Sequence, residues 1–101
     1  MELKTLQKEV YDNKVDKGFN TTDVNLEFCL LYGEVAEAYE AWRKKQNIGE
    51  ELADVAIYLL GISEILNIDL GTEIEKKIAI NRKRKYEIVD GVLSKILEKC
   101  S

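Results

Sequence analysis

The spacing of apolar residues constrains the fold of this chain more than any other feature. Apolar side chains recur at intervals of three and four residues, which is the period of an α-helix with one buried face. The β-branched residues do not alternate with polar ones, and the chain contains no proline to interrupt a helix. We therefore expect helices throughout and no strand.

Turn and capping residues divide this pattern into four helices and a terminal segment. Gly18 favours the left-handed conformation that ends a helix, and Asp23 or Thr22 can cap the next one. A break over 47–49 separates the second helix from the third, and Thr72 can cap a fourth. The expected helices cover about 2–17, 23–45, 50–66 and 72–86, with a terminal helix, or a continuation of the fourth, over 89–99.

The apolar faces predict how these helices pack. The third helix is apolar nearly all the way round, which is typical of a helix enclosed by others or by a partner subunit, so we expect it to be the central element. The first helix carries an apolar face formed by Leu3, Leu6 and Val10. The second helix carries a longer stripe formed by Val24, Phe28, Leu31, Val35, Ala38 and Trp42.

The expected fold class is all-α, a four-helix bundle with an additional C-terminal helical segment. A chain of 101 residues has the usual size of one domain, so we expect residues 1–101 to form a single folding unit. So short a domain buries a smaller share of its surface than a large one does. We therefore expect some apolar residues to be buried against another copy of the chain.

Charge and composition exclude several classes of protein. A net charge of -4 disfavours general affinity for nucleic acid and for anionic membranes. No apolar run is long enough to span a bilayer and no export signal is recognisable, so we expect a cytoplasmic protein without a membrane partner. Cys29 and Cys100 lie far apart without CxxC spacing, which argues against zinc and favours inert thiols.

Two pairs of carboxylates are set into the apolar faces of the second and third helices. Glu34 and Glu37 are three residues apart, as are Glu51 and Asp54, and side chains at this spacing are neighbours on a helix surface. Asp54 is the only charged residue between Leu52 and Ile62. A carboxylate buried without a partner costs several kcal/mol, against a total stability of roughly 5–15 kcal/mol. These four groups therefore need compensation.

A divalent cation supplies that compensation. The four side chains offer only oxygen donors, and the chain has no histidine, so Mg²⁺ is favoured, with Mn²⁺ as a substitute. The absence of histidine also argues against a ferritin-like di-iron site. A single Glu-x-x-Glu is more often a solvated face than a ligand pair, but two pairs on consecutive helices favour metal ligation. Glu27 is a candidate auxiliary group, and Glu50 is a weaker one because acidic residues are common where a helix starts.

At these residues the chain resembles the MazG-like, all-α nucleoside triphosphate pyrophosphohydrolases, whose signature is ExxE on one helix and ExxD on the next. The resemblance covers most of the chain, through residues 31–37, 51–60 and 77–84. It implies a hydrolase that cleaves (deoxy)nucleoside triphosphates to the monophosphate and pyrophosphate, in nucleotide-pool house-cleaning. It also implies Mg²⁺ held by Glu34, Glu37, Glu51 and Asp54, and assembly into a homo-oligomer, either a dimer or a tetramer.

The chemistry of such a reaction assigns further roles. A glutamate beside the attacking water would act as general base, and Glu34 or Glu37 is the candidate catalytic residue. On the fourth helix Lys77, Asn81 and Arg84 share one face, and the resemblance implies that they bind the substrate phosphates. The alternative interpretation is that the basic residues near the end of this helix bind no ligand, because the helix dipole favours positive charge at a C-terminus.

Recognition of the base is not assigned by the sequence. The aromatic side chains able to stack on a nucleobase are also typical of a helical core, and they are Tyr11, Phe19, Phe28 and Trp42.

Two other functions stay open. One is a non-catalytic helical interaction or nucleic-acid-binding module, and the other is the related phosphoribosyl-ATP pyrophosphohydrolase of the same superfamily. Assays with candidate substrates separate them.

Overall fold

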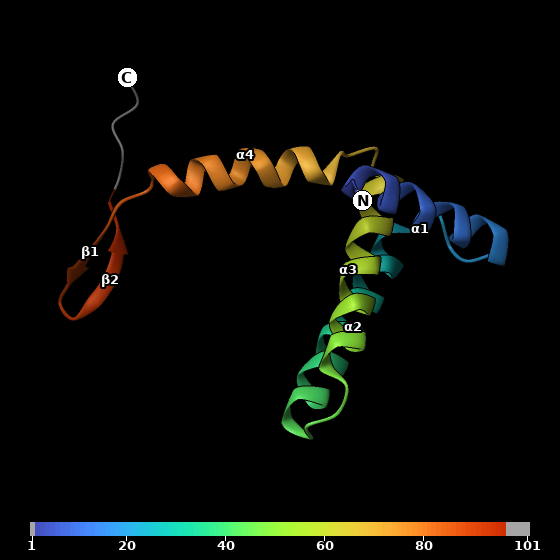
Figure 1. Cartoon of the computed structure of the whole chain (residues 1–101), viewed down its shortest axis with the longest axis horizontal. Coiled ribbons are helices and arrows are strands. Elements are labelled where there is room, and N and C mark those ends of the chain that lie inside the picture. The colour runs from blue at the N-terminus through green and yellow to red at the C-terminus, as the bar shows by residue number, and fades with distance from the viewer. Residues whose placement is uncertain (1, 97–101) are drawn as a thin grey trace. The chain divides into compact units, whose positions relative to one another are not determined.

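Four helices and one β-hairpin make up the fold in the computed structural model, which describes residues 2–96 (Figure 1). The main-chain contacts divide into two compact units, one ending at Gly71 and the other beginning at Thr72. The expectation of a single domain stays a prediction. The elements are α1 (Leu3–Lys17), α2 (Val24–Arg43), α3 (Ile48–Ile65), α4 (Leu70–Lys83), β1 (Tyr86–Val89) and β2 (Val92–Lys95).

The helix ends follow the capping chemistry of the sequence with few exceptions. Gly18 ends α1 with φ 73°, and the side chain of Asp23 accepts a hydrogen bond from the backbone N–H of Leu26 at the start of α2. Asn47 caps α3 by accepting from the N–H of Glu50, so α3 starts two residues before the predicted position. The predicted cap at Thr72 is wrong, because α4 already begins at Leu70.

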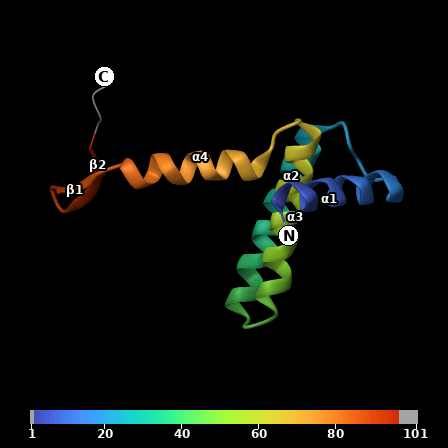
Figure 2. The same cartoon turned by 45° about the horizontal axis from the view of Figure 1, so that its top comes forward.

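In the first unit α2 and α3 run antiparallel, and α1 crosses over α3 (Figures 1 and 2). The prediction that α3 is central is confirmed for this unit, because α3 packs against both other helices. Gly61 lies at the crossing, where a Cβ atom would be 3.4 Å from Cδ of Lys14 and 3.5 Å from Cγ1 of Val10. A Cβ atom at Gly61 would thus be in ordinary van der Waals contact with the side chains of α1, which shows that α1 lies directly against α3 at this point.

The core of this unit contains only some of the residues in the predicted apolar stripes. Leu31 and Ala38 of α2 are buried, but Trp42 of the same predicted stripe is 65% exposed, and Phe28 and Val35 are also exposed. Two antiparallel helices bury only the seam between them, so the rest of a wide apolar stripe stays on the surface. The buried apolar residues are Leu31, Ala38, Ala41, Leu60 and Ile62.

Polar side chains hold α1 in place. Gln7 is 2% exposed, and its amide donates to Oε2 of Glu64 at 2.9 Å and to the carbonyl of Ile68. Its own oxygen accepts from the N–H of Leu70 at 3.2 Å. One buried glutamine therefore satisfies the backbone at the α3–α4 turn and joins this turn to α1.

The prediction that the chain is helical throughout is wrong for the C-terminal segment. Residues 89–95 were expected to be helical, but β1 and β2 form an antiparallel hairpin that pairs Val89 with Val92. Asp90 and Gly91 adopt left-handed φ values of 52° and 77°, as a two-residue hairpin turn requires. The rest of the predicted terminal helix, 97–99, lies outside the described residues. The described chain is thus mostly helical with one small two-stranded sheet.

No single helix among residues 2–96 combines the length and hydrophobicity needed to cross a bilayer.

Candidate metal centre

Three of the four predicted carboxylates converge between α2 and α3. Glu34, Glu37 and Glu51 each offer an oxygen atom, and these oxygens all lie within 4.8 Å of one another. Glu34 and Glu37 are on the same side of α2 because they are three residues apart, and α3 brings Glu51 to them across the antiparallel pair. Side chains that are distant in sequence thus form one acidic cluster.

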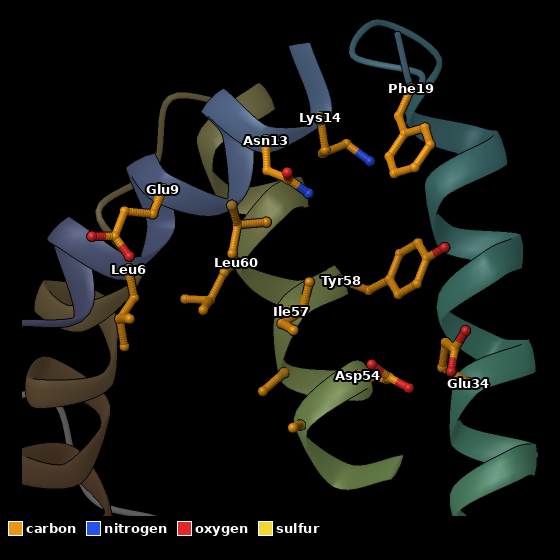
Figure 3. A pocket seen from close by; sticks show the side chains of 13 residues that line it. Leu6, Glu9, Asn13, Lys14, Phe19, Glu34, Asp54, Ile57, Tyr58 and Leu60 are labelled. Atoms are coloured by element: carbon orange, nitrogen blue, oxygen red, sulfur yellow. The ribbon is translucent and has the colours of Figure 1, made fainter. Parts of the chain in front are cut away.

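Asp54 lies one turn beyond this group of three. Its carboxylate and that of Glu34 point into the same hollow from α3 and α2, below the ring of Tyr58 (Figure 3). The charge of Asp54 acts on both Glu34 and Glu51. The structure therefore places all four predicted ligands in one region, with Asp54 at its edge.

Two buried oxygens of this cluster have no hydrogen-bond partner. Oε2 of Glu34 and Oε2 of Glu51 are buried and accept no hydrogen bond. Among residues 2–96, no lysine or arginine forms an ion pair with any of the four carboxylates. Buried oxygens without donors are costly, and a cation with oxygen ligands would satisfy them.

The pKa values record this crowding of negative charge. Burial raises the pKa of Glu34, and the charges of Glu37 and Asp54 raise it further, together with a hydrogen bond to Glu37 and the charge of Glu51. Burial likewise raises the pKa of Glu51, with added repulsion from Glu37, Asp54 and Glu50. Without a cation, the folded protein therefore binds protons at Glu34 and Glu51 more tightly than its unfolded chain does.

The contribution of Glu34 and Glu51 to stability without divalent metal should accordingly decrease as pH rises above 4.5, the ordinary pKa of these glutamates. The unfolded chain releases these protons first, so the cost is absent at lower pH and complete once pH exceeds the raised pKa of the folded state. We expect the melting temperature of Glu34→Gln, measured in a chelator, to exceed that of the wild type increasingly from pH 4 to pH 7. A constant difference across this range would contradict the crowding of charge at Glu34.

Glu27 does not belong to this cluster, although its position suggested an auxiliary ligand. Its side chain is 1% exposed and forms an ion pair with Lys14 of α1. Its other oxygen accepts from the amide of Asn20 at 3.2 Å. Because both oxygens are engaged, Glu27 serves to join α1, the following loop and α2. Glu50, the other minor candidate, accepts from the side chain of Asn47 at 3.4 Å at the start of α3.

Tyr58 is a member of the region that sequence reasoning did not single out. It follows Asp54 by one turn of α3, and Nζ of Lys14 lies 5.8 Å from the centre of its ring. Burial raises the pKa of Tyr58, and the charges of Glu34, Glu27, Asp54 and Glu37 raise it further. Its hydroxyl therefore stays protonated beside the acidic cluster.

The predicted phosphate-binding residues belong to the second unit. Lys77, Asn81 and Arg84 follow one another along α4 and its C-terminal end, and the guanidinium of Arg84 donates to Oδ1 of Asn81 at 3.0 Å. Lys77 forms no ion pair within the part of the chain described here. The side chains of Asn81 and Arg84 are thus joined by a hydrogen bond.

Comparison of the chain with protein-family models, with curated proteins and with solved structures gave no significant match.

Proposed function

We propose that this protein is a Mg²⁺-dependent nucleotide pyrophosphohydrolase of the MazG-like family. The proposed reaction cleaves a (deoxy)nucleoside triphosphate to the monophosphate and pyrophosphate. The convergence of Glu34, Glu37 and Glu51, with two buried oxygens that have no donor, is the observation that carries this proposal. The type of reaction is inferred from the resemblance of the two carboxylate pairs to the ExxE and ExxD signature.

The donor set fits a hard divalent ion. Glu34, Glu37, Glu51 and Asp54 offer carboxylate oxygens alone, which suits Mg²⁺ or Mn²⁺ and disfavours metals that prefer nitrogen or sulfur. When bound, the ion would neutralise the carboxylates, attract the phosphates and polarise water. This role also explains how so acidic a cluster could accept a polyanionic substrate.

The side chains of the protein would then divide the remaining work. Glu34 or Glu37 would accept a proton from the attacking water. The oxygen of this water would bond to phosphorus as the anhydride bond between the α- and β-phosphates breaks. Lys77, Asn81 and Arg84 would bind the phosphates, with Arg84 suited to a two-point contact. Pyrophosphate would leave with the charge released by this cleavage.

A homo-oligomer is part of the proposal. In the first unit α2 and α3 expose many large apolar side chains, and in the second α4 has no buried residue. Surfaces of this kind on a small chain are typical of subunit interfaces. The exposed side chains that support a dimer or tetramer include Leu30, Val35, Trp42, Leu52, Leu59, Ile74 and Ile78.

A substrate panel tests the proposed reaction. The pure protein is incubated with Mg²⁺ and each of the common ribo- and deoxynucleoside triphosphates, and with phosphoribosyl-ATP, and the products are separated. We expect equal amounts of monophosphate and pyrophosphate from at least one nucleoside triphosphate, and no product in a chelator. Release of orthophosphate and the nucleoside diphosphate would contradict the proposed bond cleavage. Cleavage of phosphoribosyl-ATP alone would reassign the substrate.

A further inference from the structure

A hollow of about 660 Å³ extends from the acidic cluster towards α1. Its walls are largely apolar and come from α1, the loop after it, and α3, through Leu6, Val10, Phe19, Ile57 and Leu60 (Figure 3). Glu34 and Asp54 lie at one end. The volume lies within the range of about 300–1,000 Å³ that is usual for small-molecule sites.

Few polar groups in this hollow are free to bind a ligand. Lys14 lines it, but its ammonium group is already paired with Glu27. Asn13 lies on the wall, and its amide forms no hydrogen bond with any residue that the structure describes. The hydroxyl of Tyr58 is likewise without a hydrogen-bond partner in residues 2–96. A ligand could therefore find an uncharged amide and a hydroxyl near aromatic and aliphatic walls.

We propose that this hollow binds the base of the nucleotide whose phosphates are held at the acidic cluster, an inference that rests on the proposed function. A nucleobase is flat and uncharged, with apolar faces and a polar edge. Its faces match the ring of Phe19 and the aliphatic wall, and its edge matches the amide of Asn13, which both donates and accepts. A purely hydrocarbon ligand would leave that amide unpaired, and an anionic group would be repelled by Glu9, Glu34 and Asp54.

The structure also distinguishes among the aromatic side chains able to stack on a base. Of the four that the sequence offered, only Phe19 lines the hollow that contains Glu34 and Asp54. Phe19 is 58% exposed, so it is accessible to a ligand. Trp42 lines a different depression and is stacked on Tyr39, with 6.1 Å between the ring centres. Phe19 is therefore the stacking residue of the proposal.

The test compares a nucleotide with its phosphate chain alone. KM is measured for the nucleoside triphosphate that is cleaved fastest, and Ki for inorganic tripolyphosphate, which has the phosphates and no base. We expect Phe19→Ala and Asn13→Ala each to raise KM roughly tenfold and to leave Ki unchanged. Phe19→Tyr, which keeps the ring, should retain the wild-type KM. Asn25→Ala removes an exposed asparagine outside the hollow and is the matched control.

The outcomes separate this inference from the proposed function. Unchanged KM in Phe19→Ala and Asn13→Ala, or equal increases in KM and Ki, would overturn the base site while leaving the hydrolase intact. If the wild type cleaves no nucleotide, binding of free nucleosides without metal is measured by saturation-transfer NMR. Saturable binding that is weakened roughly tenfold in Phe19→Ala would support the base site even though the hydrolase proposal had failed, and no binding would end both.

Discussion

Replacing Glu34 with glutamine is expected to slow pyrophosphate release by roughly 10²–10⁴-fold, the usual contribution of a positioned acid–base group. Glutamine has nearly the same shape, but it carries no charge to hold a cation and does not accept a proton from water. Glu34 is also the residue whose carboxylate lies both in the group of three and in the hollow with Asp54. The initial rate of pyrophosphate release at saturating Mg²⁺ and substrate measures the effect.

Asp12→Asn provides the control for this loss. It removes one negative charge from the exposed surface of α1, outside the acidic cluster, and should retain the wild-type rate. The circular dichroism and melting temperature of Glu34→Gln should show a folded protein, because removing charge from a crowded cluster does not destabilise it. A folded Glu34→Gln with wild-type activity would remove Glu34 from the reaction.

Replacing Lys14 with methionine is expected to destabilise the protein by about 3–5 kcal/mol, the usual cost of breaking a buried ion pair on one side only. Lys14 and Glu27 are 9% and 1% exposed, so Glu27 would keep a buried charge with only Asn20 as donor. A small domain has a total stability of roughly 5–15 kcal/mol, so this is a large fraction. Urea unfolding at neutral pH measures the change.

Two variants make this expectation specific. Lys14→Met combined with Glu27→Gln should recover at least half of the loss, because the double variant no longer buries an unpaired charge. Lys44→Met breaks an exposed ion pair with Glu40 and should change stability by less than about 1 kcal/mol. A Lys14→Met protein as stable as the Lys44→Met protein would show that the pair between Lys14 and Glu27 does not hold α1.

The helices could be predicted because each has a local cause. Gly18 in a left-handed conformation and the side-chain cap at Asp23 act within a few residues, and the period of the apolar residues is a property of each segment. The exposure of Trp42 could not be predicted in the same way. It depends on how many elements cover α2, and within the first unit α2 is packed closely against α3 alone.

The β-hairpin also had a local signal that the helical pattern obscured. Asp90-Gly91 is a preferred two-residue turn, and the flanking residues from Tyr86 to Val89 and from Val92 onward are rich in aromatic and β-branched side chains. The prediction of helix over 89–99 relied on apolar spacing alone. Over so short a segment, turn chemistry was the more informative evidence.

Much of the acidic cluster could be predicted because two spacings of three residues on consecutive helices restrict where the carboxylates lie. The different positions of Asp54 and Glu27 could not, because they depend on the distance and rotation between helices. Lys14 gave a signal that was missed. It lies four residues after Val10 on the apolar face of α1, and a lysine at such a position needs a buried partner, which the structure identifies as Glu27.

Titration of the protein with Mn²⁺, followed by electron paramagnetic resonance of the free ion, tests the cation site most directly. We predict saturable binding by the wild type that Mg²⁺ displaces, and a large loss of affinity in both Glu34→Gln and Glu51→Gln. Asp12→Asn should bind as the wild type does. Absence of saturable binding to the wild type, or equal binding by all four proteins, would contradict a metal centre built from these carboxylates.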